Sequence, residues 1–338
     1  MARSAASIKD VAREAGVSIG TVSNVLNRPD IVSPERRDRV LEAIRTLGYV
    51  RNDAARQLKL GRSSTVGAIV LDMGNPFYAQ LVGGIESAAE ASSLAVISGS
   101  TGNREQRERL YLSLFEEQRV RGILLASTGA SEGLIEQIRE RGTPVVLVER
   151  ERASTGGSSV SVDDFAGGEI AVRHLTELGR QRIGVIAARQ DLRQVKARLR
   201  GARAAAEAAG ASLEVIEAED LTVLAGRAAG ESVVARPREE RPDALFCVND
   251  LLAVGALQAF AFRHQIAVPE EIALVGYDDI AFARSTVVPL TSVSQPAELM
   301  GRTALALLEE EIADPDAPRR HVAFRPTLVE RASTLGEG

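Results

Sequence analysis

The chain has 338 residues, a length that predicts about two domains. Its hydrophobic share of 45% and charged share of 26% exclude a mainly disordered, collagen-like or coiled-coil chain. No apolar run approaches the length of a membrane span and the first residues lack the apolar core of a signal peptide, so we expect a cytoplasmic protein with no membrane partner. With one cysteine and three scattered histidines, neither a disulfide nor a metal site is expected, and no cofactor is predicted.

The charge is divided unevenly along the chain. Residues 1–62 hold 12 Lys and Arg against 7 Asp and Glu, a surplus of +5, whereas the remainder holds 29 against 39, a deficit of −10. A basic segment on an acidic body indicates a module that binds a polyanion such as DNA, joined to a domain that does not share this partner. The alternative is a solvated basic helical segment.

Three short helices are predicted within residues 1–50. They begin after Ser7, Ser18 and Ser33, which are typical N-cap residues, and a turn at Gly16 joins the first two as in a helix-turn-helix unit. Apolar side chains at helical spacing form the inward faces: Ile8, Val11, Ala12 and Ala15; Val22, Val25 and Leu26; Val40, Leu41, Ile44 and Leu47.

The head contains the dense motifs IKDVAREAGVSIGTVSNVLN, VSPERRDRV and LGYVRNDAARQL. In these residues the chain resembles the DNA-binding head of the LacI/GalR (lactose-repressor) family. The resemblance implies that the partner is double-stranded operator DNA and that the second helix enters its major groove. A three-helix packing domain with no role in DNA binding is the alternative.

By this resemblance, the first outward residues of the second helix read base edges. Asn24 can pair with adenine, Ile19 can contact a thymine methyl group, and Gly20 permits close approach. Many relatives carry Arg where Asn24 stands, so the preferred bases should differ from theirs. Thr21 and Ser23 are assigned to phosphate contact, or else to plain helix surface. The DNA-contacting residues are expected to be Ser18, Ile19, Gly20, Thr21, Ser23, Asn24, Asn27, Asn52, Arg56 and Leu58.

Residues 51–62 are polar and too few to hold a helix alone in water. The resemblance implies a hinge helix that forms on the operator against the hinge of a second copy. It also implies that Leu58 is driven into a minor-groove step, where an apolar wedge kinks the duplex. The alternative is a flexible linker.

From Thr65 onward, short apolar runs alternate with helical stretches, which predicts parallel strands buried on both faces. The fold class is therefore an all-α helix-turn-helix head plus an α/β body with two parallel-sheet subdomains, and the body resembles the periplasmic-binding-protein-like core of the same family. We expect one subdomain at about 63–160 and 293–323, and the other at about 161–292 and 324–338. The segments SSVSVD and TSVSQ are expected to be the crossovers between them.

Ligands of such sheets bind beyond the carboxyl ends of the strands, and the residues there are unusually polar. Carboxylates, amides and guanidinium groups around an aromatic ring suit a sugar or sugar derivative. Leu221 stands where several sugar-binding relatives place an aromatic residue and Ala126 where some place a polar one, so the ligand itself is left open. The expected ligand-binding residues, which match family positions around the cleft, are Asn75, Phe77, Glu149, Arg150, Arg198, Asn249, Asp278 and Gln295.

Several of these residues also have plainer interpretations. Asn75 could be a turn former, and Glu149 and Arg150 could simply pair with each other. Asp250 is expected to cap the helix that follows Asn249. Asp279 is expected to serve its loop, and Arg198 to open a helix.

Two rival functions are less well supported. The doublets Asp163-Asp164 and Asp278-Asp279 resemble the carboxylates of a glycosidase, but adjacent residues of an extended chain point in opposite directions. No nucleophile motif is present, so no catalytic residue is predicted. The missing signal peptide and the basic head oppose an extracytoplasmic sugar-binding protein.

The predicted function is a sequence-specific transcriptional regulator, most simply a repressor, controlled by a small effector. Family tetramers add a C-terminal heptad helix, whereas this chain ends STLGEG, so a homodimer on a pseudo-palindromic operator is expected. The sequence leaves open the identity of the effector and whether it induces or co-represses.

Overall fold

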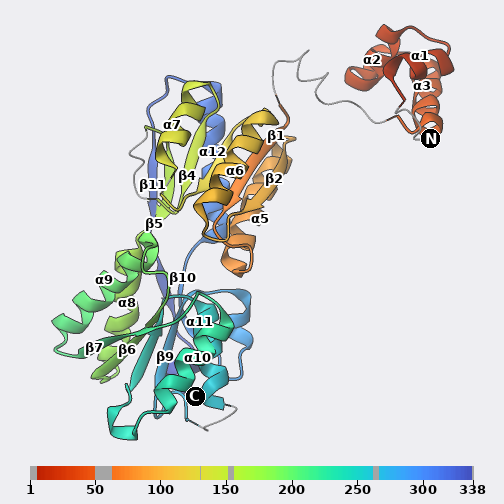
Figure 1. The fold of residues 1–338 in the computed structure, drawn as a ribbon. Coiled ribbons are helices and arrows are strands. Elements are labelled where there is room, and N and C mark those ends of the chain that lie inside the picture. Colours follow the sequence, from red (N-terminus) through yellow and green to blue (C-terminus); the bar gives the residue numbers. More distant parts are fainter. Residues whose placement is uncertain (1–5, 50–62, 130, 151–155, 262–265, 337–338) are drawn as a thin grey trace. The chain divides into compact units, whose positions relative to one another are not determined.

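The computed structural model describes residues 6–49, 63–129, 131–150, 156–261 and 266–336 (Figure 1). The chain divides into two compact units, Met1–Arg62 and Ser63–Gly338, here called the head and the body. The predicted hinge helix and its expected DNA-contacting residues Asn52, Arg56 and Leu58 lie outside the described residues. Among those residues, none of the helices combines the length and apolar character that a membrane crossing requires.

The head contains the three predicted helices, and their predicted N-cap positions are confirmed. Ser7 forms a reciprocal capping box with Asp10, and the Ser18 hydroxyl accepts a hydrogen bond of 3.1 Å from the Thr21 amide. Ser33 occupies the third N-cap position without a side-chain cap bond. The helices are α1 (Ile8–Glu14), α2 (Ile19–Asn27) and α3 (Pro34–Leu47), with a 3₁₀ turn at Pro29–Ile31.

The core of the head forms where the three helices meet. Val11, Val22 and Val40 are fully buried there, one from each helix. The prediction that Leu41 points inward is wrong, because Leu41 is 42% exposed and Ala43 is buried in its place. The reason is the helical repeat: position 41 lies about 100° around the helix from Val40, whereas 43 and 44 return to the same face.

The body contains two six-stranded sheets. The first has the order β11-β5-β4-β3-β1-β2 and is entirely parallel; its strands are β1 (Thr65–Val70), β2 (Ala95–Ser100), β3 (Ile123–Ala126), β4 (Val145–Val148), β5 (Ser159–Val162) and β11 (His321–Phe324). The second has the order β12-β10-β9-β8-β6-β7; its strands are β6 (Arg182–Ala187), β7 (Ser212–Glu217), β8 (Ala244–Cys247), β9 (Ala273–Asp278), β10 (Thr291–Ser294) and β12 (Thr327–Val329). Only β12, at the edge, runs antiparallel to its neighbour β10.

Helices cover both faces of each sheet, so each sheet with its helices forms a lobe. The first lobe has α5 (Pro76–Ala91), α6 (Glu105–Glu117), α7 (Glu132–Glu140) and α12 (Ala297–Ala313); the second has α8 (Asp164–Glu177), α9 (Arg193–Ala208), α10 (Val223–Val234), α11 (Asp250–Ala259) and α13 (Ala332–Leu335). In β3, Leu124 packs in the core shared with α5 and α12, whereas Leu125 packs in the core shared with α6 and α7. This two-sided burial explains the continuous apolar runs of the sequence.

The segments expected to be crossovers are themselves strands. SSVSVD forms β5 of the first sheet, and TSVSQ forms β10 of the second. The chain passes between the lobes after each strand, at the start of α8 and of α12. The expected boundaries at 160 and 293 therefore fall inside strands. Both strands combine Ser or Thr with Val and lack a long apolar run, although all four residues of β5 and the first three of β10 are buried.

Three helix pairs pack closely through glycines. A Cβ atom at any of six positions would lie within 2.3 Å of a backbone oxygen of the partner helix or its flank: Gly84 and Gly301 (α5 with α12), Gly168 and Gly201 (α8 with α9), Gly226 and Gly255 (α10 with α11). The α8–α9 pair matters most for function, because Arg198 lies one turn before Gly201 in the R-x-x-G motif.

We predict that Gly201→Ala destabilises the body by about 2–3 kcal/mol, because its new methyl group would meet the Phe165 carbonyl oxygen at 1.9 Å. The control is Gly83→Ala in α5, where nothing lies within 4 Å and alanine should be neutral or slightly stabilising. Urea unfolding of the full chain measures both. Equal stability of the two variants would contradict the close packing of α8 on α9.

Candidate functional site

The solvent-facing side of α2 carries the residues expected to read DNA bases. Val22 and Val25 are buried, so the opposite face is open: Ile19 is 46% exposed, and Gly20 and Asn24 are also exposed. The fold thus leaves Ile19 and Asn24 free for contact with a groove.

Among the described residues of the head, none requires glycine at position 20. A Cβ atom there would meet only the Ser18 hydroxyl, at 3.6 Å, which is ordinary contact. Glycine inside a helix costs about 0.5–1 kcal/mol relative to alanine. Packing within the head therefore does not explain Gly20, whereas the close approach of a binding partner to α2 would.

The other predicted residues of α2 are engaged within the helix. Ser18 and Thr21 join their hydroxyl groups at 3.0 Å, besides the cap bond. The Asn27 amide donates to the Ser23 carbonyl oxygen at 2.7 Å. Asn27 therefore holds the C-terminal turn of α2, a role the sequence interpretation did not foresee.

In the body, Asp278 stands at the centre of a buried polar network between the two lobes. Its two carboxylate oxygens accept hydrogen bonds from the side-chain amides of Asn75, at 2.9 Å, and Gln295, at 2.8 Å. Asn75 begins α5 of the first lobe and also caps it by accepting from the Phe77 amide. Asn75 is thus more than a turn former, because it joins the two lobes through Asp278.

Arg198 is the cation of this network. It lies in the second turn of α9, which begins at Arg193, so the expectation that it opens a helix is wrong. Its Nε donates to Asp164 at 2.8 Å, its Nη1 donates to the Val248 carbonyl oxygen at 2.7 Å, and its guanidinium group stacks on the Tyr277 ring at 3.6 Å.

The charges around Arg198 keep it ionised. Burial opposes its charge, but Asp164, Tyr277 and Asp278 outweigh burial and raise its pKa. Burial likewise raises the pKa of Asp278 to about 6, although Arg198 and the two amides oppose that shift. The attraction between the buried carboxylate and the guanidinium group is strong here because water does not screen either charge.

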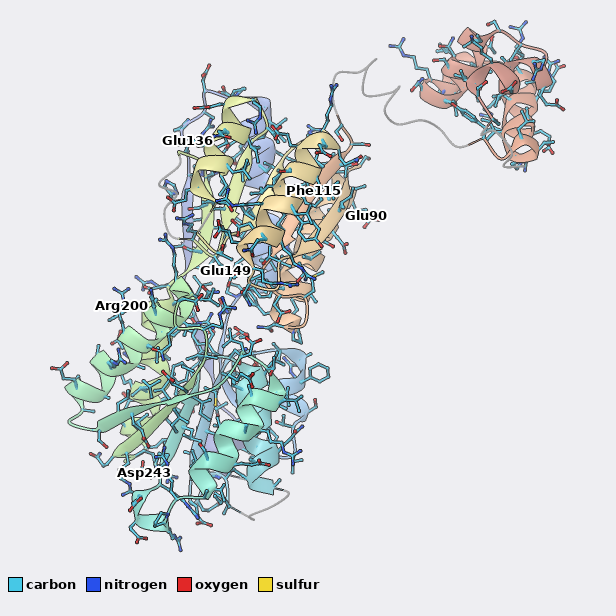
Figure 2. All side chains as sticks on the ribbon, in the orientation of Figure 1. Glu90, Phe115, Glu136, Glu149, Arg200 and Asp243 are labelled. Carbon is cyan, nitrogen blue, oxygen red and sulfur yellow. The ribbon has the colours of Figure 1, made fainter. Side chains whose placement is uncertain are left out.

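Glu149 forms the second buried acid of the site. Figure 2 shows it where the two lobes of the body meet, and the Tyr78 hydroxyl donates a hydrogen bond of 2.7 Å to its carboxylate. Burial raises the pKa of Glu149 to about 7, against the hydrogen bond from Tyr78, which lowers it. Glu149 can therefore change its protonation state near neutral pH.

The backbone is strained at the ends of two strands in this site. Glu149, after β4, has a φ of 59°, and Asp278, at the end of β9, has a φ of 108°. Side chains other than glycine rarely adopt this region, and such strain collects at functional sites where the surrounding fold holds it in place. The conformation turns both carboxyl groups away from the regular course of their strands.

The prediction that Asp250 caps α11 is wrong. Asn249, and not Asp250, is the N-cap of α11: its oxygen accepts from the Leu252 amide at 2.9 Å, and its amide donates to the Leu221 carbonyl oxygen at 3.2 Å. Asp250 instead accepts from Ser292 at 2.6 Å and from the Ile280 amide at 2.8 Å. It therefore fastens β10 and the loop after β9 to α11.

Arg150 and Glu149 do not form the ion pair that the sequence left open as an alternative. Arg150 pairs with Glu132 of α7, not with Glu149. The reason is that adjacent side chains after β4 diverge, and α7 brings a carboxylate to the other side. Asp279 bonds to Arg331 at 2.6 Å, so it serves the loop as expected and ties it to the C-terminal segment.

Free space in the cleft is small, about 30 Å³, enough for about two water molecules but not for a sugar ring. Phe77 is 1% exposed and belongs to the core of the first lobe, so it forms a fixed wall of the cavity. Gln295 and Arg150 do not line this cavity. Its walls include the predicted Asn75, Phe77, Glu149, Arg198, Asn249 and Asp278, together with Tyr78, Asn103 and Leu221.

Sequence interpretation missed four residues of the site. Tyr78 and Asp164 contact Glu149 and Arg198 directly, and the Tyr277 hydroxyl donates to Asp164 at 3.1 Å. The Asn103 side-chain oxygen is buried and accepts no hydrogen bond from the described residues. Tyr78, Asn103 and Tyr277 follow or end an expected strand, whereas Asp164 follows SSVSVD, which was expected to be a crossover. Ala126 lies in the core of the first lobe.

Comparison with known proteins decides the family. The model of bacterial regulatory proteins of the lacI family matches residues 7–52, and that of a periplasmic binding protein-like domain matches residues 172–334. The ribose operon repressor of Escherichia coli (strain K12) is 35% identical over 97% of this chain and 99% of its own length. The HTH-type transcriptional repressor PurR of Aliivibrio fischeri (strain MJ11) is 32% identical over 98% of both chains. The chain belongs to the LacI family. It is a DNA-binding transcriptional regulator and not an enzyme.

Solved structures agree with this assignment. A complex of the transcriptional regulator CelR with cellobiose is 33% identical, covers 97% of this chain and 99% of its own, and has a TM-score of 0.71. The lac repressor dimer bound to operator and an anti-inducer is 24% identical with a TM-score of 0.82 over 98% of this chain and 100% of its own, and shows the same fold. The LacI-family fold predicted from sequence, a helical head and a body with two mainly parallel sheets, is confirmed.

We predict that Glu149 makes the stability of the body depend on pH. Its native pKa of about 7 lies above the ordinary 4.5, so the native state binds its proton more tightly and loses stability as the pH rises from about 4.5 to 7. The contribution of Glu149 should be on the order of 3 kcal/mol and should be missing in Glu149→Gln, which retains only the smaller loss expected from Asp278, whose pKa is raised to about 6.

The measurement is urea unfolding at pH 5 and pH 8. Glu136→Gln, on an exposed position of α7 (Figure 2), is the matched control and should behave as the wild type. Identical pH slopes for Glu149→Gln and the wild type would show that Glu149 does not titrate in this range.

Proposed function

We propose that this LacI-family regulator is a cytoplasmic, homodimeric repressor whose operator affinity is set by a sugar or sugar derivative bound between the lobes of the body. The observation that carries the proposal is the network centred on Asp278. It joins the lobes through Asn75 and holds a buried cation, Arg198, beside unfilled space. Such a network is costly unless all its members find partners, and a polar ligand can supply partners.

The chemistry of the walls supports a polyol. Glu149 and Asp278 can accept hydrogen bonds from hydroxyl groups, Arg198 can donate, and the Asn103 oxygen is an unused acceptor among the described residues. Phe77 and Leu221 add apolar surface for the C–H face of a ring. Among relatives, CelR is described in complex with cellobiose and a regulator from Enterococcus faecalis, 27% identical, with ribose.

Entry of a sugar requires the lobes to separate or the network to exchange its partners, because only about 30 Å³ is free. A ligand that replaces the bond between Asn75 and Asp278 therefore changes how the lobes contact each other. Because a ligand shifts an equilibrium only through its different affinities for two states, this exchange is the means by which binding in the body can alter operator affinity.

The head supplies the DNA contacts under this proposal. Ile19, Gly20 and Asn24 read bases in the major groove, while Ser18, Thr21 and Ser23 support the helix and contact phosphates. Leu58 enters a minor-groove step, and Asn52 and Arg56 also contact the DNA. Two heads on one dimer require an operator of two half-sites related by two-fold symmetry.

Asn24→Ala should weaken binding to the operator by about 1–3 kcal/mol and leave binding to unrelated DNA almost unchanged, because only a base contact is removed. The operator is first selected from random duplexes with the wild-type protein. Both proteins are then titrated with this duplex and with a scrambled one at one salt concentration. Equal weakening on both duplexes would show that Asn24 does not read sequence.

Asp278→Asn should bind the operator normally and ignore the effector, because the variant loses a charged acceptor at the centre of the cleft and leaves the head untouched. The effector is identified first by a thermal-shift screen of sugars, including ribose and cellobiose, on the wild-type chain. Operator affinity is then measured with and without it, together with calorimetry of the same sugar.

The control for this variant is Asp316→Asn, in an exposed loop of the first lobe. It should respond to the effector as the wild type does. If Asp278→Asn keeps its affinity for the sugar, the effector site lies elsewhere and the proposed cleft is wrong.

A further inference from the structure

A second cavity of about 460 Å³ adjoins the cleft. We call it the basic pocket, because four of the residues that line it are cations: Arg150, Arg193, Lys196 and Arg200. Three of them follow one another along α9 at helical spacing and therefore share one face of that helix. Figure 2 shows Arg200 on this helix.

The acids that line the basic pocket are engaged elsewhere. Asp164 accepts from Arg198 at 2.8 Å and from Tyr277 at 3.1 Å, and Glu149 accepts from Tyr78. One further acid, Glu132, pairs with Arg150 and lies 3.6 Å from Arg193. Four cations thus face three carboxylates, of which Asp164 is already paired with Arg198, so the pocket keeps an excess of positive charge.

Arg150 shows that the pocket is built and not merely a basic surface. Its side chain is 5% exposed, and its Nε and Nη1 are buried without a hydrogen-bond partner among the described residues. Buried guanidinium donors without partners are costly, and each calls for an explanation such as a missing ion. Arg150 lines the basic pocket, so an anion there, met by a turn of the guanidinium group, would supply the acceptors.

The basic pocket is continuous with the proposed sugar cleft. Glu149 and Gln194 line both cavities. On α9, Arg198 faces the cleft while Arg193 and Lys196 face the basic pocket, so a single ligand can contact both through one helix.

We propose that the basic pocket binds a phosphoryl group, and that the effector of this regulator is a phosphorylated sugar. The inference rests on the proposed function for the sugar part but not for the anion. A phosphoryl group carries about 1.5–2 negative charges and three acceptor oxygens, which match several cations around one cavity. Arginine is also well suited to bind phosphate through two parallel hydrogen bonds.

The test compares three kinds of probe on the full chain by calorimetry and thermal shift at constant ionic strength. They are inorganic phosphate, the sugars ribose and glucose, and the esters ribose 5-phosphate and glucose 6-phosphate. We expect inorganic phosphate alone to raise the melting temperature, and at least one ester to bind at least tenfold more tightly than its parent sugar.

Variants locate the effect. Lys196→Gln and Arg200→Gln are exposed changes on α9 that should leave the fold intact and weaken binding of phosphate and of the ester about tenfold each. The matched control, Arg203→Gln, is also exposed on α9 but does not line the pocket, and should bind as the wild type does.

The outcomes separate the two proposals. If phosphate does not bind and each ester binds no better than its sugar, the basic pocket is not a phosphate site. If phosphate binds equally well to Lys196→Gln, Arg200→Gln and the wild type, the assignment to this pocket is also overturned.

If those variants lose phosphate binding and no sugar or ester binds more tightly than phosphate, the anion site holds and the proposed sugar ligand fails. If phosphate tightens binding of the parent sugar, a free anion and not an ester occupies the pocket.

Discussion

The buried charge of Arg198 is the constraint on which the body depends. A guanidinium group removed from water must be matched by acceptors, and Asp164, the Val248 carbonyl oxygen and the Tyr277 ring provide them. The close packing of α8 on α9, made possible by Gly168 and Gly201, brings these groups to one point. Asp278, 3.8 Å from the same guanidinium group, then extends the network to the other lobe. In this part of the fold, the packing of the helices therefore determines where the polar groups of the site lie.

The two central acids of the cleft are hydrogen-bonded by neighbouring side chains. Asp278 is bonded by Asn75 and Gln295, and Glu149 by Tyr78. A ligand must offer at least equal partners, which favours molecules rich in hydroxyl groups over apolar ones. The raised pKa values of Glu149 and Asp278 show that burial, and not a neighbouring acid, is the main influence on each group. The adjoining basic pocket has the opposite character, because its cations outnumber the acids that could neutralise them.

The head follows a different design. Its core is small and is formed by valines and alanines from all three helices, which fixes the buried face of α2. The residues on the outer face of α2 contribute little to that core, so they can change with the operator sequence without loss of the fold. This separation explains how one scaffold can serve regulators with different DNA preferences.

The sequence by itself determined the local structure and the family. N-caps, helical spacing and continuous apolar runs predict the helices of the head and most strands of the body, because these signals act over a few residues. The rule that ligands lie beyond the carboxyl ends of parallel strands also predicts most of the residues that line the cleft. Tertiary structure decided which side chains pair. Asn75 and Asp278 are 203 positions apart, and Tyr277 and Asp164 are 113 apart. Whether Arg150 meets Glu132 or Glu149, and whether Asp250 caps a helix or binds Ser292, depends on the packing of segments distant along the chain. Local sequence patterns do not specify pairings between residues so far apart along the chain.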